Sequence, residues 1–214
     1  MSEKAETTAS GTPTPFTRYE KFLETVREAC GTPVGRATLQ QGLADLAEAV
    51  TAGSQGSTWR LYTVLLPHGP IPAWRQERDA EYPFLLIACL YALHDAPNPR
   101  TTTARRRKPP ATDGRCNLGW SYARATAMKI QTAPRARDEL LALATLDLDG
   151  LYQQLPGAIA RLRSRAVPVA WPVLLRDLVR WGRFADDVRI DWFRSLTAPA
   201  PVHTDSTTTK ENNR

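Results

Sequence analysis

The stretch VAWPVLLRDLVRWGRFADDVRIDWFRSL, residues 169–196, decides the fold. Apolar side chains in its first half have the spacing of one helix face, and those in its second half repeat every four residues. Gly182 separates the two patterns and predicts the end of the first helix. The stretch therefore predicts two short helices that bury their aromatic side chains, and the apolar positions are Leu174, Leu175, Leu178 and Trp181, then Val188, Trp192 and Leu196.

The opposite side of the first of these helices is basic. Arg176, Arg180 and Arg183 follow one another at intervals of four and three residues, which predicts a continuous cationic stripe. Such a stripe is typical either of a solvated helix face or of a surface that binds an anion. The distribution of charge along the chain favours the second interpretation.

The net charge of the chain is +6 and its sequence pI is about 9.5, but the two halves differ. Residues 18–99 contain seven Lys or Arg against nine Asp or Glu, whereas residues 100–197 contain eighteen against nine. Sixteen of those eighteen cations are Arg, which contacts phosphate through a planar pair of donors. A positive field confined to one half attracts phosphate polyanions or acidic lipid surfaces.

Every substantial segment between the two ends has helical apolar spacing, and no convincing alternation of a strand is found. The sequence therefore predicts an all-α protein. Ser-, Thr- and Pro-rich composition predicts disordered tails over residues 1–15 and 198–214. The Pro-, Thr- and Arg-rich residues 98–115 predict a basic linker between an N-terminal helical bundle, residues 16–97, and a C-terminal helical bundle, residues 116–197.

The apolar periods also place the individual helices. Pro156 and Gly157 interrupt the cleanest pattern, and a kink or a broken helix is expected there. The segment 59–66 fits a strand or a helix by pattern alone, and its helical neighbours favour a helix. The expected helices before residue 169 are 18–30, 36–50, 59–66, 77–94, 117–130, 135–145 and 148–162.

Further cations gather in the second half. Arg161, Arg163 and Arg165 follow one another at the end of the segment 148–162, which predicts a second basic helix face beside the first. Residues 105–108 are four adjacent cations, either an exposed solvated loop or an arm that captures phosphate. Cations repeated along rigid elements fit a phosphate backbone and require no contact with base edges.

Catalytic motifs are absent from the sequence. Cys30, Cys89 and Cys116 are odd in number and widely spaced, so neither a disulfide framework nor a zinc site is indicated. No nucleophile elbow, zinc-protease or phosphate-loop motif occurs. The longest apolar run, residues 84–93, is too short to span a bilayer, and the N-terminus lacks the apolar core of a signal peptide. We therefore expect a cytoplasmic protein that is not an enzyme and has no cofactor and no metal.

The C-terminal stretch resembles the closing segment of the CasB family, the small subunit of the type I-E CRISPR surveillance complex Cascade. The resemblance rests on Pro168, Trp171, the run LLRDLVRW at 174–181, and the pair Trp192 and Phe193. Three further segments match in order: GRATLQQGL at 35–43, LYALHDAP at 90–97 and NLGWSYARA at 117–125. Three positions depart from the family pattern: Ala170 stands in place of an acidic residue, and Pro156 and Gly157 replace part of the arginines expected in the preceding helix.

The resemblance implies two helical bundles and a non-catalytic subunit. Two copies would contribute to the backbone of the complex, contact other Cascade subunits, and lie along guide RNA and target DNA, holding the displaced strand and stabilising the R-loop. The candidate nucleic-acid contacts are Arg36, Arg105, Arg106, Arg107, Lys108, Arg124, Arg135, Arg137, Arg161, Arg165, Arg176, Arg180 and Arg183.

Two other functions fit some of the residues. The stretch 171–196 could act as a helix-turn-helix in a DNA-binding regulator. Asp186, Asp187 and Asp191 could hold the metal of a helical nuclease, although such clusters more often begin a helix and balance nearby arginines.

Overall fold

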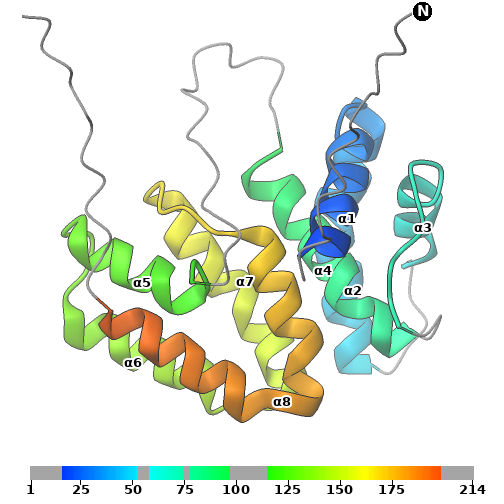
Figure 1. The fold of residues 1–214 in the computed structure, drawn as a ribbon. Helices are drawn as coiled ribbons and strands as arrows, with labels where there is room; N and C mark the ends of the chain where they lie inside the picture. Colours follow the sequence, from blue (N-terminus) through cyan, green and yellow to red (C-terminus); the bar gives the residue numbers. More distant parts are fainter. Residues whose placement is uncertain (1–15, 53–57, 75–77, 97–114, 199–214) are drawn as a thin grey trace, which may run out of the picture.

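The computed structural model describes residues 16–52, 58–74, 78–96 and 115–198. Within these ranges the chain forms eight helices and no strand, which confirms the all-α prediction (Figure 1). The predicted tails and nearly all of the predicted linker lie outside the described residues. The helices are α1 (Thr17–Ala29), α2 (Pro33–Ala52), α3 (Trp59–Leu65), α4 (Arg78–His94), α5 (Leu118–Ala127), α6 (Ala133–Ala144), α7 (Leu148–Ser164) and α8 (Trp171–Thr197).

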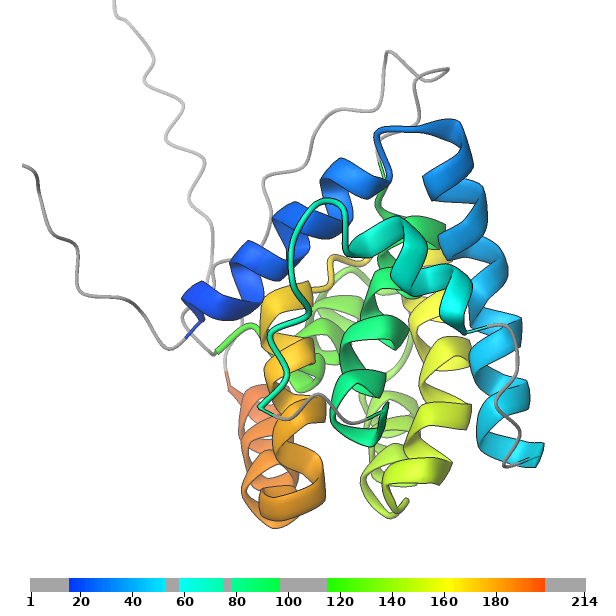
Figure 2. The ribbon, with the colours of Figure 1, turned by 90° about the vertical axis from the view of Figure 1, so that its right-hand side faces the viewer.

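Helix α4 forms the centre of the molecule. Its residues 84–92 are almost wholly buried, because α1, α2, α7 and α8 all pack around it (Figure 2). A helix that is apolar on every side requires such surroundings. The α2–α3 contact beside it is tight, since a Cβ added to Gly42 would lie 2.3 Å from Cδ2 of Leu61.

Helix α5 begins with the segment NLG, which fits it against α8. The Asn117 side chain accepts a hydrogen bond from the Trp120 amide at 3.2 Å and donates one to the Asp191 carbonyl at 3.0 Å. A Cβ at Gly119 would lie 1.8 Å from the carbonyl oxygen of Trp192, so only glycine permits this approach. The start of α5 is thus both capped and packed by the same three residues.

Helix α7 continues through Pro156 and Gly157, so of the two expected outcomes the broken helix is wrong, while the kink stays a prediction. Proline at this position removes one backbone hydrogen bond. Apolar side chains on both sides of it, including Leu155 and Ile159, are buried and keep the helix in place. The lost bond is therefore outweighed by packing on either side.

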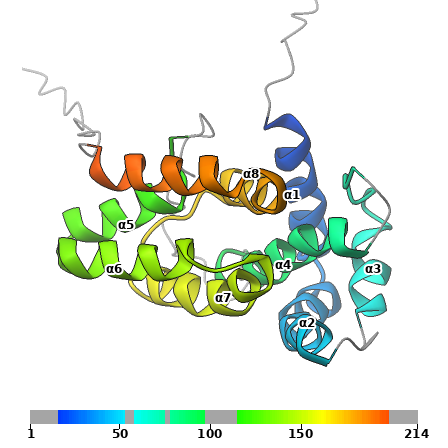
Figure 3. The same cartoon turned by 90° about the horizontal axis from the view of Figure 1, so that it is seen from below.

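Helix α8 changes direction at Phe184, whose backbone is not helical (φ −135°, ψ 41°). The two expected helices are thus present, but the break lies two residues after Gly182. Its first half packs beside α1 and α4, and its second half lies along α5 and α6 (Figure 3). Across the bend the Trp181 and Trp192 rings are 4.9 Å apart between centroids.

The two halves of the chain share one continuous set of buried apolar side chains. Tyr82 of α4 stacks on Tyr152 of α7 with ring centroids 4.4 Å apart. Asp95, at the end of α4, accepts hydrogen bonds from Trp171 at 2.6 Å and from Arg163. The division into two bundles remains a prediction, but these contacts give the described helices a shared core.

Candidate nucleic-acid interface

The arginines of α8 do not form the continuous stripe that their spacing predicts. Arg176 donates from Nε and one terminal nitrogen to Oδ1 of Asp177, at 2.9 and 2.6 Å. Its guanidinium lies 4.9 Å from the centroid of the Phe16 ring, and only 17% of its side chain is exposed. Arg176 therefore stabilises the α1–α8 contact and presents little charge to solvent.

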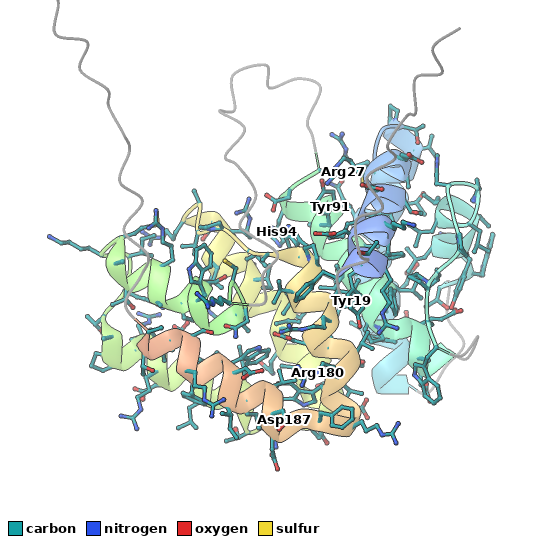
Figure 4. All side chains as sticks on the ribbon, viewed as in Figure 1. Tyr19, Arg27, Tyr91, His94, Arg180 and Asp187 are labelled. Atoms are coloured by element: carbon teal, nitrogen blue, oxygen red, sulfur yellow. The ribbon has the colours of Figure 1, made fainter. Side chains whose placement is uncertain are left out.

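The bend in α8 places carboxylates beside the next arginine. Arg180 lies 3.9 Å from Asp187 and 4.0 Å from Asp191, both in the second half of the helix (Figure 4). Arg183 is exposed and lies over the Phe184 ring at 5.7 Å. Linear spacing could not show this, because the bend returns residues of the second half toward the first.

The basic face of α7 is also divided. Arg163 turns toward the interior, where it binds Asp95 and donates to the Val167 carbonyl at 2.8 Å. Arg161 and Arg165 remain exposed. In the N-terminal half, Arg36 is half-buried and donates to the Cys30 carbonyl at 3.3 Å, which joins the start of α2 to the end of α1.

A different grouping arises where α5, α6 and α7 meet. The last turns of α7 lie beside the middle of α6, where Arg161 comes within 3.8 Å of Glu139, and α5 contacts both helices. These segments carry five exposed cations, the half-buried Arg124, and two carboxylates, Asp138 and Glu139. We group the cations as the candidate α5–α7 basic patch: Arg124, Lys129, Arg135, Arg137, Arg161 and Arg165.

Glu139 organises one side of the patch. It accepts a 2.9 Å hydrogen bond from Nε of Arg135 and lies 3.8 Å from Nε of Arg161, so it fixes one guanidinium from α6 and one from α7. Tyr122 lies beneath this pair, and burial, with the nearby Glu139 carboxylate, raises the pKa of its hydroxyl to about 12. Both arginines remain more than half exposed, at 68% and 57%.

The other patch cations keep their charge available. Among the described residues no carboxylate lies within 4 Å of Arg124, Lys129, Arg137 or Arg165. Outward guanidinium and ammonium groups on three rigid helix ends are suited to phosphate oxygens, which they contact without reading base edges. The patch is therefore our candidate for a nucleic-acid surface within the described part of the chain.

Lys129 belongs to this surface but was not among the predicted contacts. It follows the end of α5 with a φ of +57°, a conformation that favours glycine. The amides of Lys129 and Ile130 donate back to the carbonyls of Thr126 and Ala125, which closes the helix end. Its position between Arg124 and Arg135 in the sequence could have pointed to Lys129. The turn that exposes it is visible only in the structure.

The predicted linker contacts Arg105, Arg106, Arg107 and Lys108 lie outside the described residues. Within the described ranges, no three His, Cys, Asp or Glu side chains gather as metal ligands would. Asp186 pairs with Arg189 at 2.8 Å, and Asp187 and Asp191 flank Arg180. None of the helices in these ranges has both the length and the apolar composition of a membrane span.

The family model for CRISPR-associated protein Cse2 matches residues 36–195, three quarters of the chain. The chain belongs to the Cse2 family. This confirms the CasB resemblance on which the sequence prediction rests, since structures named CasB and structures named Cse2 both match. A comparison with curated proteins found no match.

Solved structures agree with membership of the Cse2 family. A chain of a CRISPR RNA-guided surveillance complex is 25% identical with a TM-score of 0.62, covering 85% of this chain and 94% of that one. A pre-nicking form of such a complex gives 26% identity with the same TM-score and coverage. CasB of M. ruber, at 20% identity, shares the fold with a TM-score of 0.62 and coverage of 84% and 91%.

Proposed function

We propose that this Cse2-family chain is the non-catalytic small subunit of a type I-E Cascade complex and that its α5–α7 basic patch stabilises the R-loop. The similar surveillance-complex structures support the assignment to such a complex. Two copies would join the other Cascade subunits in the cytoplasm, beside guide RNA and target DNA. The protein requires neither cofactor nor metal for this role.

The observation that carries the proposal is the α5–α7 basic patch. Exchange of a DNA duplex for an RNA–DNA heteroduplex is nearly balanced, so modest backbone contacts determine how long the opened state persists. Five exposed cations and the half-buried Arg124, carried by three packed helices, can supply such contacts to the displaced strand. Our proposal does not rest on Arg176, which was among the predicted contacts, or on Arg163, because an aspartate pairs with each of them.

The helix-turn-helix alternative receives no support from α8. The second half of α8 would have to present its first turn to DNA, but this turn carries Asp186 and Asp187, which repel phosphate. Binding of the isolated protein to one duplex sequence in preference to others would favour this alternative. Salt-sensitive binding without sequence preference would favour the Cascade assignment.

The test uses the assembled complex, purified with the other proteins of its locus and a guide RNA. The variant Arg137→Glu/Arg165→Glu reverses two patch charges that have no carboxylate partner. We expect it to assemble normally and to release its target DNA at least tenfold faster. The matched control is Arg27→Glu, an exposed position on α1 far from the patch (Figure 4). Equal R-loop lifetimes for the patch variant and the control would contradict the proposal.

A further inference from the structure

Two neighbouring recesses flank Arg189 in the second half of α8. The first, of about 460 Å³, surrounds the bend and is lined by residues 181–187 and Arg189. The second, of about 350 Å³, lies between α6 and α8 and is lined by Leu141, Ala144, Thr145, Arg189 and Phe193. Because Arg189 belongs to both, the two recesses form one surface, which we call the α6–α8 groove.

The α6–α8 groove exposes large apolar side chains. Leu141 and Phe184 line it and are 48% and 47% exposed, and Ile190, next to Arg189 in the sequence, is 48% exposed. Ile190 lies three residues before Phe193, so both face the same side of α8. Apolar side chains gathered around recesses, rather than scattered singly, are typical of a protein-binding surface.

Two buried N–H donors in the groove lack acceptors. Nε1 of Trp181 and Nε of Arg189 have no hydrogen-bond partner among the described residues, and Trp181 is only 2% exposed. The outer nitrogens of Arg189 are fixed on Asp186 at 2.8 Å and on the Leu146 carbonyl at 3.2 Å. A buried donor without an acceptor costs free energy, and a carbonyl oxygen from a bound segment would remove that cost.

The charge of the groove does not suit a nucleic acid. Arg183 and Arg189 are balanced by Asp186 and Asp187 around the first recess. The second recess holds no carboxylate and only the guanidinium that it shares with the first. A neutral polypeptide backbone with apolar side chains is therefore a better occupant than a polyanion.

The chain itself offers no segment that could fill the groove. The residues outside the described ranges contain two large apolar side chains, Met1 and Val202, and these stand at opposite ends of the sequence. All other large apolar side chains already belong to the described fold. The occupant must therefore come from another polypeptide.

We propose that the α6–α8 groove binds an extended segment of a different protein subunit of the same complex. Such a segment would place one apolar side chain beside Phe184, a second between Leu141 and Phe193, and a backbone carbonyl near the unpaired N–H groups of Trp181 and Arg189. This rests on the proposed function, because it takes the partner from the Cascade assembly. The α6–α8 groove would then bind protein, and the α5–α7 basic patch would contact phosphate.

The test combines two variants with site-specific crosslinking in the assembled complex. Leu141→Glu places a charge in the groove and Ile190→Glu places one next to Arg189, both at half-exposed positions, so the fold should persist. Gln153→Glu on the exposed side of α7 is the control. We expect at least a tenfold drop in the share of the chain that remains with the complex on dilution. DNA binding by the free variants should stay unchanged, since the α5–α7 basic patch is intact.

A photo-reactive amino acid at position 141 identifies the occupant. A crosslink to a different protein subunit, located by mass spectrometry, supports the inference. Crosslinks only to nucleic acid or to a second copy of the chain overturn it, as does wild-type retention of both groove variants. If the wild-type chain fails to join the complex at all, the proposed function fails as well, and the two failures are thereby distinguished.

Discussion

The indole Nε1 of Trp192 donates a 2.8 Å hydrogen bond to Oδ2 of Asp177, fifteen residues earlier and on the other side of the bend in α8. The second oxygen of the same carboxylate holds Arg176. Asp177 is 1% exposed, and burial raises its pKa more than Arg176 and Trp192 lower it. One buried carboxylate thus fixes the angle between the two halves of the helix.

Replacement of Asp177 should therefore unfold the protein more readily. Asp177→Ala leaves the Arg176 guanidinium and the Trp192 N–H without a partner, and we expect a loss of about 3 kcal/mol in the free energy of unfolding. Asp177→Asn keeps an acceptor for Trp192 and should cost less. Urea denaturation measures both, and the exposed Asp138→Ala should change stability by less than about 0.5 kcal/mol. A similar stability for Asp177→Ala and the control would contradict this role.

Replacement of Lys129 by glycine should raise stability and weaken DNA binding. Its left-handed backbone disfavours any side chain, so Lys129→Gly should stabilise the protein by about 1 kcal/mol. The same change removes a patch cation, and the salt slope for single-stranded DNA should fall by about 0.7. Ala166 closes α7 in the same conformation, so Ala166→Gly should stabilise to a similar extent without changing the salt slope. An unchanged slope for Lys129→Gly would remove Lys129 from the patch.

Replacement by alanine should change the stability of the protein in opposite directions at two helical glycines. Gly157 is exposed on α7, and a Cβ there would meet only an Arg161 nitrogen at 3.5 Å, so Gly157→Ala should stabilise by about 0.5–1 kcal/mol. At Gly119 the Cβ would overlap the Trp192 carbonyl, so Gly119→Ala must separate α5 from α8 and destabilise. Thermal unfolding midpoints report both changes. A higher midpoint for Gly119→Ala would show that α5 can move away from α8 without cost.

His94 should make stability depend on pH. Burial, followed by the charge of Arg163, lowers the pKa of His94, although Asp95 opposes this. The folded state then binds a proton less readily than the unfolded state, so stability falls as pH decreases through the unfolded pKa of about 6.5. The slope attributable to one histidine cannot exceed about 1.4 kcal/mol per pH unit. Unfolding measured between pH 7.5 and 5.5 should be less pH-dependent for His94→Gln, and equal slopes would contradict the assignment.

The sequence predicted the helices well because apolar spacing depends on short-range geometry. Residues 174–181 and 188–196 have one buried face each, and both are helical as expected. Pro156 does not break α7, because tertiary packing on this helix outweighs the local cost of proline. The position of the break in α8 also differed, because Gly182 permits a turn but does not require one.

The candidate site was harder to predict because side-chain direction depends on partners far apart in the chain. Arg163 and Arg165 are two residues apart, yet Asp95 draws one inward and the other stays exposed. Arg176 looked like part of a basic stripe, whereas its neighbour Asp177 and the Phe16 ring hold it at a helix contact. Conversely, Arg135 and Arg161 come from different helices and meet only through Glu139.

The two ends of the long α4–α5 connection are both attached to the C-terminal helices. Asp95 is bound by Arg163 and Trp171, and Asn117 is bound by the Asp191 carbonyl. The Asp95 contacts and the packing of α4 against α7 and α8 cross any cut between these anchors, so such a cut would release no domain. The nicked protein should elute as one particle, and its two fragments should separate only on denaturation.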